Sequence, residues 1–356
     1  MDLKRLRRAI DSIDSDILRL LNKRACVIKD VGAEKAKKNA AIYVPDREKD
    51  VYTRLVAQNK GPLPNESVKA IFREVMSSAL NLERPLKIAY LGPEFTFTHL
   101  ASMKKFGHSV SYAGCETITD VFNEVEKGRA DYGVVPIENS IEGAVNHTLD
   151  MFADTDLKIC SEIYLEISHS LLSRNADRKR IKRVYSKAEV FAQCRSWLEA
   201  NLYGVELIEA SSTAKAASIA AAEKASACIA SELAGKRYRL KVLSRGIEDS
   251  VHNVTRFLVI GRNEVRPTGC DKTSLMFSVK DRAGALHDML VPFKKYRINL
   301  TKIESRPSKV RAWEYYFFVD LEGHVRDARV SRAVVELGRT ASYVKVLGSY
   351  PVGAGV

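Results

Sequence analysis

The chain has 356 residues, of which 46% are hydrophobic and 28% are charged, and its formal net charge is +13 at pH 7. This composition excludes an intrinsically disordered chain and predicts two or three globular domains. No run approaches the roughly 18 apolar residues of a membrane-spanning helix, so we expect no membrane partner. The first residues lack the apolar core of a secretory signal, which favours a cytoplasmic location.

The excess of Lys and Arg lies at both ends of the chain, where it is compatible with nucleic acid, small anions or solubility alone. The basic run 179–183 has no interleaved aromatic residues, so we interpret it as a solvated surface and expect no nucleic-acid partner. The six cysteines are too widely spaced for a zinc knuckle or a CxxC pair, and no nucleotide-binding, zinc-protease or serine-hydrolase motif occurs. We therefore expect neither a metal nor a cofactor.

The first 84 residues are typical of long helices. Pro45 and the segment 61–65 interrupt the pattern and predict a second helix through about Asn59 and a third after it. A single helix cannot bury the apolar stripe of the opening segment, so we expect an intertwined homodimer, or a homotetramer. The stripe recurs at intervals of three and four and consists of Leu3, Leu6, Ile10, Ile13, Ile17, Leu20, Val27 and Val31.

Arg24 occupies a position of this stripe where the pattern requires an apolar residue, and Lys35 lies 11 residues later on the same helix face. An unpaired buried cation is costly, so both charges could reach solvent or meet Glu74 or Glu83 of another helix. The alternative is a polycationic pocket for a doubly charged anion. The pattern alone leaves both interpretations open.

The segment contains, in order, Leu6-Arg7, Leu20-Leu21-x-x-Arg24, Lys35, Arg47-Glu48 and Glu83. This order resembles the all-helical chorismate mutase domain, which is an intertwined dimer. The resemblance implies that Arg24 and Lys35 bind the carboxylates and ether oxygen of chorismate. Arg47 and Glu48 would bind its ring hydroxyl side, and Arg7 would reach in from the second subunit. Donors aimed at the ether oxygen stabilise the charge that develops there, so the rearrangement needs no nucleophile.

Two positions depart from that family pattern. Val44 stands where an aspartate is common, which removes one polar contact, and Glu83 stands where an amide is common. A carboxylate cannot donate to an ether oxygen, so Glu83 must be protonated to act on it. Burial favours this protonation and Lys35 opposes it. We therefore predict a mutase rate that rises below neutral pH.

After Pro85 strands and helices alternate, which predicts parallel sheets with helices on their faces. Two groups of such elements are joined by a linking strand and a returning strand, so we expect two α/β lobes with a cleft between them. The expected strands are 87–91, 132–137, 163–171, 184–185, 205–208, 227–230 and 255–261, and the expected helices are 98–106, 121–127, 190–201 and 213–224.

Polar residues gather at the carboxyl ends of the first strands, where α/β proteins bind ligands. The strings are Leu91-Gly92-Pro93 through Thr96-Phe97-Thr98, Val134 through Gly143, Tyr185-Ser186 with Gln193, and Asn253-Val254-Thr255-Arg256-Phe257. Taken singly, Thr96, Thr98 or Ser140 more often caps a helix than binds a ligand.

Together these strings resemble prephenate dehydratase over nearly all of residues 87–262, and Thr255-Arg256-Phe257 is the most characteristic triplet. The resemblance implies a two-lobed fold like that of periplasmic binding proteins. Thr255 is the candidate donor of a proton to the departing C4 hydroxyl, and a relayed water or the substrate's own carboxyl are the alternatives. The implied prephenate-binding residues are Thr96, Thr98, Asn139, Ser140, Ser186, Gln193, Thr255 and Arg256.

Phe95 stands where the dehydratase family has glycine. A bulky residue fits poorly at a position that needs a positive φ or a close backbone approach. We therefore expect either a reduced dehydratase activity or a rearranged first loop.

Residues 270–356 predict the β-α-β-β-α-β order of a ferredoxin-like fold. The expected strands are 273–280, 299–305, 313–321 and 344–350, and the expected helices are 284–296 and 327–340. Ala283-Gly284-Ala285-Leu286, Ile303-Glu304-Ser305-Arg306-Pro307 and Trp313-Glu314-Tyr315 resemble the phenylalanine-binding ACT domain. The resemblance implies that L-phenylalanine binds near Gly284, Ala285, Leu286, Glu304, Ser305 and Arg306 and closes the catalytic cleft.

The sequence thus predicts an all-α dimer domain at 1–84, a two-lobed α/β domain at 86–262 and an α+β ACT domain at 270–356. The resemblances imply two enzymes of phenylalanine biosynthesis in one chain, which form prephenate and then phenylpyruvate under feedback inhibition by L-phenylalanine. One alternative is an amino-acid sensor that has lost catalysis and keeps a helical dimerisation arm. Another is a basic DNA-binding regulator, which would bind duplex DNA in a salt-sensitive manner.

Overall fold

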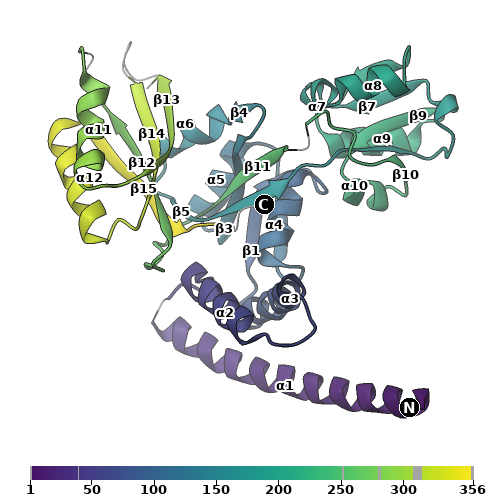
Figure 1. The fold of residues 1–356 in the computed structure, drawn as a ribbon, viewed down its shortest axis with the longest axis horizontal. Coiled ribbons are helices and arrows are strands. Elements are labelled where there is room, and N and C mark those ends of the chain that lie inside the picture. Colours follow the sequence, from purple (N-terminus) through teal and green to yellow (C-terminus); the bar gives the residue numbers. More distant parts are fainter. Residues whose placement is uncertain (1, 39, 251, 280–281, 308–314, 354–356) are drawn as a thin grey trace. The chain divides into compact units, whose positions relative to one another are not determined.

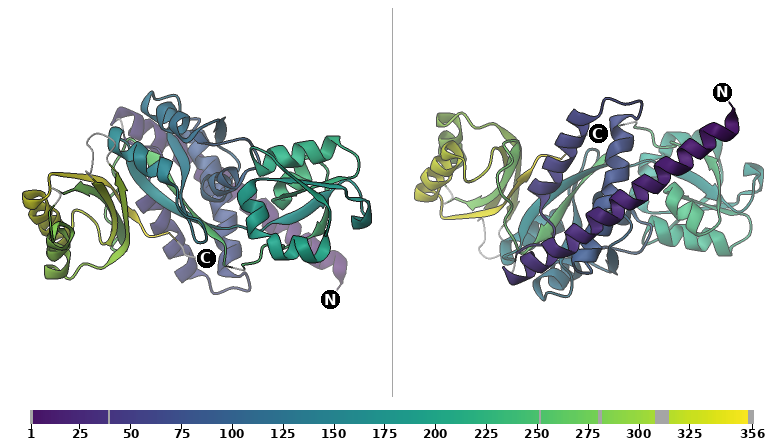
Figure 2. Two further views of the ribbon diagram at one scale, coloured as in Figure 1. Left: turned by 90° about the horizontal axis from the view of Figure 1, so that it is seen from above. Right: turned by 90° about the horizontal axis from the view of Figure 1, so that it is seen from below.

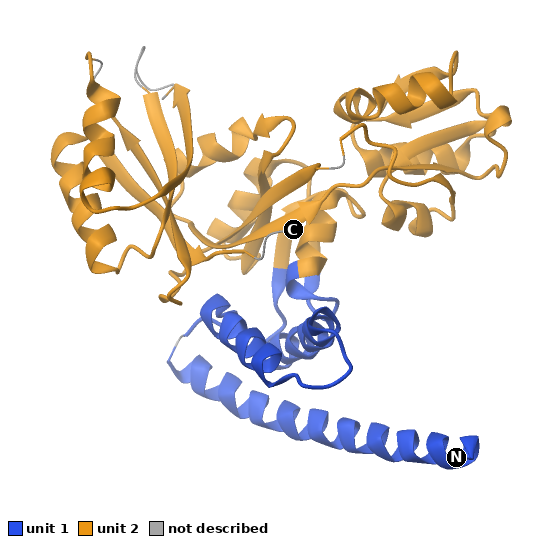
Figure 3. Ribbon diagram, in the orientation of Figure 1, with its two compact units in different colours: residues 1–87, 105–111 blue, residues 88–104, 112–356 orange. Residues whose placement is uncertain are grey.

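The structure of the chain is a computed structural model that describes residues 2–38, 40–250, 252–279, 282–307 and 315–353. The chain forms two compact units (Figure 3), of which the first comprises residues 1–87 and 105–111. The second comprises residues 88–104 and 112–356. In these described ranges, no helix has a stretch both long and apolar enough to cross a bilayer.

The first unit consists of three helices and a short returning segment. α1 spans Leu3–Lys37, α2 spans Pro45–Gln58 and α3 spans Asn65–Glu83, as the interruptions at Pro45 and Gly61 predict (Figure 1). α1 is the longest helix of the chain's described part, as Figure 2 shows, and none of its residues is buried. Its apolar stripe is therefore open to solvent in the single chain.

Residues 105–111 belong to the first unit because they pack against α3. Glu74 Oε2 accepts a hydrogen bond from the backbone N–H of His108 at 3.0 Å, and Ser77 Oγ accepts one from Ser109 N at 3.0 Å. Gly107 makes the turn with a φ of +71°, and a Cβ there would lie 2.6 Å from Ser77 Cβ. This turn therefore joins residues 105–111 to the helices of the first unit.

The first sheet of the second unit has the order β2-β1-β3-β11-β5, with β4 paired to β3. β1 and β3 are parallel, and β11 runs antiparallel between β3 and β5. α5 begins with a capping box between Thr117 and Asp120. The elements are β1 Lys87–Leu91, α4 Phe97–Phe106, β2 Ser111–Cys115, α5 Ile118–Glu126, β3 Tyr132–Asn139, β4 Gly143–Ala144, α6 Asn146–Asp154, β5 Lys158–Glu166 and β11 Val254–Gly261.

The second sheet has the order β10-β6-β9-β7-β8, and its core is rich in alanine where α9 packs on it. The elements are β6 Ser170–Ser173, the short 3₁₀ helix η1 Arg178–Arg180, β7 Arg183–Ser186, α7 Ala188–Gln193, α8 Arg195–Asn201, β8 Glu206–Glu209, α9 Thr213–Ala222, β9 Ser226–Ala230, α10 Glu232–Arg237 and β10 Lys241–Ser244.

Two elements of this region differ from the sequence prediction. The expected helix 190–201 is broken at Cys194, because the Asp249 carboxylate accepts the backbone N–H groups of Ser196 and Trp197 and starts a new helix there. The expected strand 163–171 is two strands, since β5 ends at Glu166 in the first sheet and β6 begins at Ser170 in the second. An alternating pattern does not reveal where a chain passes from one sheet to another.

The third sheet has the order β13-β14-β12-β15, and α11 and α12 cover one of its faces (Figure 1). This arrangement confirms the ferredoxin-like prediction. Trp313 and Glu314, which the sequence places in a strand, lie outside the described residues. The elements are β12 Asp271–Ser278, α11 Ala285–Lys295, β13 Leu300–Pro307, β14 Tyr315–Glu322, α12 Ala328–Thr340 and β15 Tyr343–Pro351.

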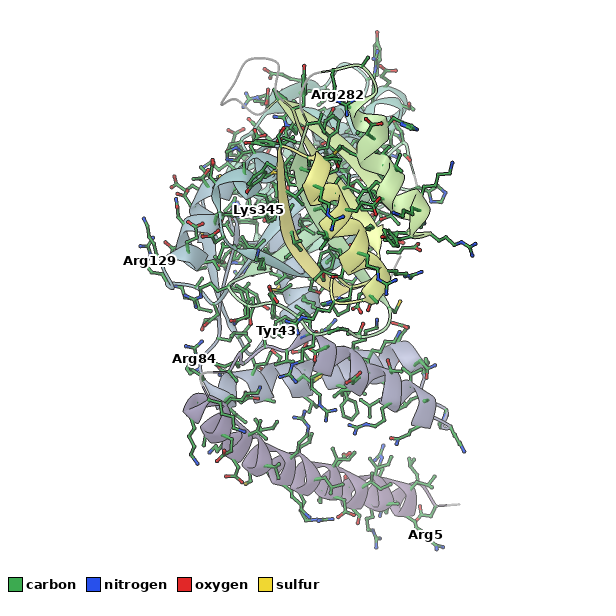
Figure 4. All side chains as sticks on the ribbon, turned by 90° about the vertical axis from the view of Figure 1, so that its left-hand side faces the viewer. Arg5, Tyr43, Arg84, Arg129, Arg282 and Lys345 are labelled. Carbon is green, nitrogen blue, oxygen red and sulfur yellow. The ribbon has the colours of Figure 1, made fainter. Side chains whose placement is uncertain are left out.

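β15 of the third sheet packs closely against β5 of the first. A Cβ on Gly348 would lie 2.3 Å from the carbonyl oxygen of Ile159, so only glycine permits this crossing. Lys345, labelled in Figure 4, donates to the carbonyl oxygen of Phe152 at 3.0 Å, and Lys158 donates to that of Val346 at 2.9 Å. The two sheets therefore form one continuous packed body.

Candidate active sites

The first unit contains a cavity of about 540 Å³, called here the helical cavity. Residues of α1, α2 and α3 line it, together with Lys105 and Phe106 at the end of α4. Its volume lies in the range of small-molecule sites. Basic side chains outnumber acidic ones on its wall, which carries Arg24, Lys35, Arg47, Arg54, Arg73 and Lys105 against Glu48 and Glu83.

Lys35 is neutralised inside this cavity. Its Nζ donates to Glu83 Oε2 at 2.8 Å and to the carbonyl oxygen of Ile42 at 2.8 Å, and the Glu83 side chain is only 6% exposed. Glu74, the other acid considered for this role, instead binds His108 at the turn after α4. Pairing with Glu83 therefore accounts for Lys35, one of the two cations on the helix face that carries the apolar stripe.

Arg24 is not neutralised in this way. It forms no ion pair with any residue of the described ranges, although the Glu83 carboxylate acts on it through space. Burial and the neighbouring Arg47 lower the pKa of the Arg24 guanidinium, and Glu83 offsets this only in part. An anion in the helical cavity would relieve that unfavourable environment.

The other sequence-predicted residues of this unit divide into two groups. Arg47 and Glu48 line the helical cavity from α2, whereas Arg7 is exposed on α1 and does not. Val44 precedes α2 as its N-cap and provides no side-chain hydrogen bond there. The aspartate that is common at this position would supply one, so the departure costs a cap as well as a polar contact.

The second unit contains a cavity of about 570 Å³, called here the sheet cavity, at the carboxyl ends of β1 and β3. Its position agrees with the expected ligand site of an α/β protein. Five of the eight predicted residues line it, and they are Thr96, Thr98, Asn139, Gln193 and Thr255. Thr96 also caps α4, since its Oγ1 lies 3.5 Å from the backbone nitrogen of His99.

A chain of side-chain hydrogen bonds crosses this cavity wall, and its directions are fixed at one end by Glu142. A carboxylate can only accept, so Gln193 Nε2 donates to Glu142 Oε1 at 2.5 Å. Gln193 Oε1 must then be an acceptor, and it receives Asn253 Nδ2 at 2.9 Å. His169 Nε2 lies 2.9 Å from the same oxygen and therefore carries a proton.

The other end of the chain is fixed by backbone groups. Asn139 Oδ1 accepts the N–H groups of Ile141 at 2.9 Å and Glu142 at 3.1 Å, so its Nδ2 must point the other way. That Nδ2 donates to Asn253 Oδ1 at 2.8 Å and to Thr255 Oγ1 at 2.8 Å. Both ends thus impose the same orientation on Asn253, which is only 2% exposed.

Thr255 Oγ1 is an acceptor in this chain, so its own hydrogen is free to donate elsewhere. No acceptor for it occurs among the described residues, and Thr255 lines the sheet cavity. The arrangement therefore leaves a hydroxyl proton available to a ligand in the cavity.

Sequence reasoning missed His169, which also lines the sheet cavity. It is 1% exposed, and burial lowers its pKa. Because Nε2 carries the proton, the neutral imidazole presents Nδ1 as an acceptor, and this atom has no hydrogen-bond partner in the described part of the chain. The spacing of the histidines in the sequence does not indicate such a role, because the role depends on the contact of His169 with Gln193, which is 24 residues away.

Three predicted prephenate-binding residues lie outside the sheet cavity. Ser140 Oγ donates to His252 O at 2.7 Å and accepts Val254 N at 2.9 Å, which joins two strand ends. Ser186 is fully buried and donates to Ile229 O at 2.8 Å. Arg256 follows Thr255 on β11, and the alternation of side chains along a strand directs it to the opposite face.

Arg256 instead lies in a buried ion cluster where the third sheet meets the first. Its guanidinium donates to Glu162 at 2.8 Å, Glu138 at 2.9 Å and Asp320 at 2.6 Å, and also to the hydroxyl of Tyr350. Burial alone would lower the pKa of Arg256, but Tyr350, Asp320 and Glu162 raise it above its usual value.

Two lysines balance the remaining charge of this cluster. Lys272 donates to Glu162 at 2.9 Å, and Lys302 donates to Glu138. Burial would raise the pKa of Glu138, but the hydrogen bonds from Lys302 and Arg256 lower it below its usual value. Three cations therefore face three carboxylates, and each of the two sheets supplies both positive and negative side chains.

Phe95 adopts the left-handed conformation that glycine would favour, with a φ of +69°. Its ring packs against Tyr238 at a centroid separation of 6.4 Å and under the guanidinium of Arg237 at 5.7 Å, both from the end of α10. The first loop thus accommodates a bulky residue by packing it on the second lobe.

The residues that the sequence assigns to an effector lie at two places in the third sheet region. Gly284 has a φ of +76° and begins α11, followed by the buried Ala285 and the half-buried Leu286. Glu304, Ser305 and Arg306 lie on the edge strand β13.

Arg306 forms a two-point contact with Asp150 of α6, at 3.2 and 3.1 Å. This contact connects the edge strand β13 directly to a helix of the first sheet. In the described ranges, no group of three or more His, Cys, Asp or Glu side chains could hold a metal ion.

Comparison with known proteins identifies three matching family models. Residues 6–84 match chorismate mutase type II, residues 88–265 match prephenate dehydratase, and residues 273–339 match the ACT domain. A bifunctional chorismate mutase/prephenate dehydratase of Aquifex aeolicus (strain VF5) is 52% identical over 354 residues, which cover 98% of each chain.

Two solved structures resemble the second unit. Prephenate dehydratase from Arthrobacter aurescens, in complex with L-Phe, is 34% identical with a TM-score of 0.70 and covers 75% of this chain and 90% of its own. GqqA, described as a novel type of quorum quenching acylase, is 26% identical with a TM-score of 0.69 and covers 75% and 98%. The same fold thus serves other chemistry, so the roles of individual residues have to be argued from the sites.

Proposed function

Since the chain belongs to the family of bifunctional chorismate mutase/prephenate dehydratases, we propose that the helical cavity is its mutase site and the sheet cavity its dehydratase site. The enzyme rearranges chorismate to prephenate and then removes water and carbon dioxide to give phenylpyruvate, two steps of phenylalanine biosynthesis. The observation that carries the assignment is the contrast between the cavities. The helical cavity is rich in cations, whereas the sheet cavity presents hydroxyl and amide groups whose hydrogen-bond directions are fixed.

In the helical cavity, we infer that the unpaired Arg24 binds a carboxylate of chorismate, with Arg47 beside it. Lys35 lines the same cavity and would share its protons between Glu83 and the ether oxygen of the substrate. The cavity holds the substrate in its compact conformer, and the cations stabilise the charge that develops on that oxygen. This reaction needs no nucleophile, and the wall of the cavity supports positioning and electrostatics instead.

Arg24→Gln tests this assignment. We expect the mutase kcat/KM to fall by about 100-fold, the scale seen when a transition-state donor is removed. Dehydratase activity on added prephenate should be retained in the same preparation, which shows that the loss is confined to the first unit. Equal mutase activity in the variant and the parent enzyme would remove Arg24 from the site.

In the sheet cavity, we infer that Thr255 donates its proton to the C4 hydroxyl of prephenate. As the C4–O bond breaks, the hydroxyl leaves as water and the C1 carboxylate leaves as carbon dioxide, and its electrons complete the aromatic ring. The free Thr255 hydrogen and the fixed acceptor role of its oxygen support this direction of transfer. Aromatisation supplies the driving force, so a weak acid is sufficient.

Thr255→Ala and Thr255→Ser form the matched test. We expect the alanine variant to lose about 100-fold or more in dehydratase kcat, as removal of a general acid does, while serine retains activity. Mutase activity on chorismate serves as the internal control. An alanine variant with unchanged kcat would transfer the role to a relayed water or to the substrate's own carboxyl.

We propose that L-phenylalanine binds the ACT segment near Gly284–Leu286 and Glu304–Arg306 and inhibits the dehydratase. The contact between Arg306 and Asp150 supports this, because it connects an expected effector residue to a helix beside the catalytic sheet. Millimolar L-phenylalanine should lower dehydratase activity and change the oligomer size, and D-phenylalanine is the control. Absence of both effects would contradict the proposal.

We propose that the chain is a homodimer, or a homotetramer built from such dimers, in which the stripe of α1 packs against a second copy. Leu3, Ile10 and Ile17 are 60%, 56% and 49% exposed in the single chain, which is unfavourable for a stripe of this length. The same packing would bring Arg7 of the second copy to the helical cavity.

Two measurements test this assembly. Ile10→Glu with Ile17→Glu should reduce the mass in light scattering, and Arg7→Gln should lower mutase activity without changing the mass. A monomeric parent enzyme would overturn the proposal.

We also propose a cytoplasmic location, since the relatives are named as biosynthetic enzymes.

A further inference from the structure

The helical cavity receives a cation from outside the three helices that resemble the mutase family. Lys105, near the end of α4, lines the cavity, and its Nζ lies 2.9 Å from Glu48 Oε2. The two side chains are 21% and 14% exposed, so water screens this pair only weakly. Residues 105–111 belong to the helical unit, as Figure 3 shows.

The position of Lys105 is fixed by aromatic packing. Its Nζ lies 5.8 Å from the centroid of the Tyr43 ring, and Tyr43 is 4% exposed. The neighbouring Phe106 meets the same ring edge-on at 5.0 Å. A lysine held over a buried ring next to a carboxylate has few other places for its head group.

Glu48 makes its polar contacts with the described residues through one oxygen. Oε2 accepts the hydroxyl of Tyr43 at 2.9 Å and pairs with Lys105 at 2.9 Å. Oε1 takes no hydrogen bond from the described residues, although Glu48 lines the cavity. The carboxylate is thus held from one side and remains an acceptor on the other.

We propose that Lys105 is a positioning residue of the mutase site, which orients Glu48 so that its free oxygen accepts the ring hydroxyl of chorismate. This inference rests on the proposed assignment of the helical cavity to the mutase reaction. It extends the functional mutase unit beyond residue 84 to the turn at 105–111. Lys105 acts through Glu48 and does not contact the reacting atoms.

The test is a double-mutant cycle on the full chain with Lys105→Gln, Glu48→Gln and both together. We expect each single variant to lower mutase kcat/KM by about tenfold, since each loosens the same contact to the substrate. The double variant should be no worse than Glu48→Gln alone. Lys105→Arg should restore most of the activity, because arginine also pairs with the carboxylate.

Two controls accompany the cycle. Lys60→Gln removes a charge from an exposed lysine of the same unit and should leave mutase kcat/KM unchanged. Dehydratase activity on added prephenate reports folding in every variant. Should Lys105→Gln lower both activities, Lys105→Met keeps the packing on Tyr43, removes the charge and takes its place in the cycle.

Each outcome decides the proposal. Unchanged mutase activity in Lys105→Gln, with a loss in Glu48→Gln, overturns the role of Lys105 and leaves the cavity assignment intact. Losses that multiply in the double variant also overturn it, since Lys105 would then act on the substrate independently of Glu48. No loss in Glu48→Gln itself would instead refute the proposed assignment of Glu48 in the cavity.

Discussion

Thr255 and Arg256 are consecutive residues of β11 that belong to different environments. Thr255 lines the sheet cavity and pairs across the sheet with Asn139, whereas Arg256 pairs with Glu138 and lies in the buried ion cluster. The alternation of the strand therefore places the sheet cavity and the contact to the third sheet on opposite faces of the same two strands.

The ion cluster should be important for stability. In Arg256→Met, Asp320 would remain buried without a cationic partner and Glu162 would keep only Lys272, and we expect the free energy of unfolding to fall by about 3–5 kcal/mol. Both tryptophans of the chain, at 197 and 313, belong to the second unit, so their fluorescence during urea unfolding reports this unit alone.

Arg282→Met is the matched control for that change. Arg282 pairs with Asp288 on the surface, where both side chains are well exposed, and such pairs contribute less than about 1 kcal/mol. Equal losses in the two variants would show that the cluster around Arg256 is not a buried one in solution.

Glu138 should make the stability of the second unit sensitive to acid. Its pKa is lower in the folded chain than the usual 4.5, so ionised Glu138 favours the folded state above that value. The contribution is lost as the pH falls from 4.5 towards the lower pKa of the folded state. We expect Glu138→Gln to weaken this acid dependence in urea unfolding, and an unchanged pH dependence would contradict the ion-pair assignment.

Asn253 should matter for dehydratase turnover although it was not among the predicted site residues. In Asn253→Asp, an oxygen replaces the donor towards Gln193 Oε1, and the two acceptors would repel each other. We expect the dehydratase kcat to fall by about 10- to 100-fold, because the orientation of Asn139 and Thr255 is no longer fixed. Steady-state kinetics with prephenate should show a smaller change in KM, and a change in KM alone would assign Asn253 to binding.

Substitutions of Phe95 separate the effect of its backbone conformation on stability from the effect of its ring. Phe95→Ala and Phe95→Gly both lose the packing on Tyr238, but only glycine is free of strain at a φ of +69°. We expect the glycine variant to be more stable than the alanine variant by about 0.5–1 kcal/mol, since its gain is partly offset in the unfolded chain. Urea unfolding measures the difference, and a more stable alanine variant would contradict it.

Much of this architecture follows from the sequence. Helix breakers such as Pro45 and Gly61 locate the helices of the first unit, and strand–helix alternation locates both lobes. Residue roles are harder, because they depend on the orientation of a side chain. Thr255 and Arg256 belong to one motif, yet the strand separates them, and Ser186 is fully buried where its motif suggests a cleft residue.

The residues to which the sequence assigned no role have partners far away in the chain. Lys105 meets Glu48, and Asn253 meets both Asn139 and Gln193. Neither local periodicity nor motif spacing encodes such pairs, since the folded chain alone brings them together. His169 is a similar case, because only its buried contact with Gln193 reveals its tautomer.

The crossing at Gly348 limits how this enzyme can be re-engineered. The Ile159 carbonyl leaves no room there for even a methyl group. A foreign regulatory domain fused after the catalytic lobes would therefore need a glycine at the same point. Without it, the grafted strand would be held away from β5, and the contacts that Lys345 and Lys158 make across this crossing would be lost.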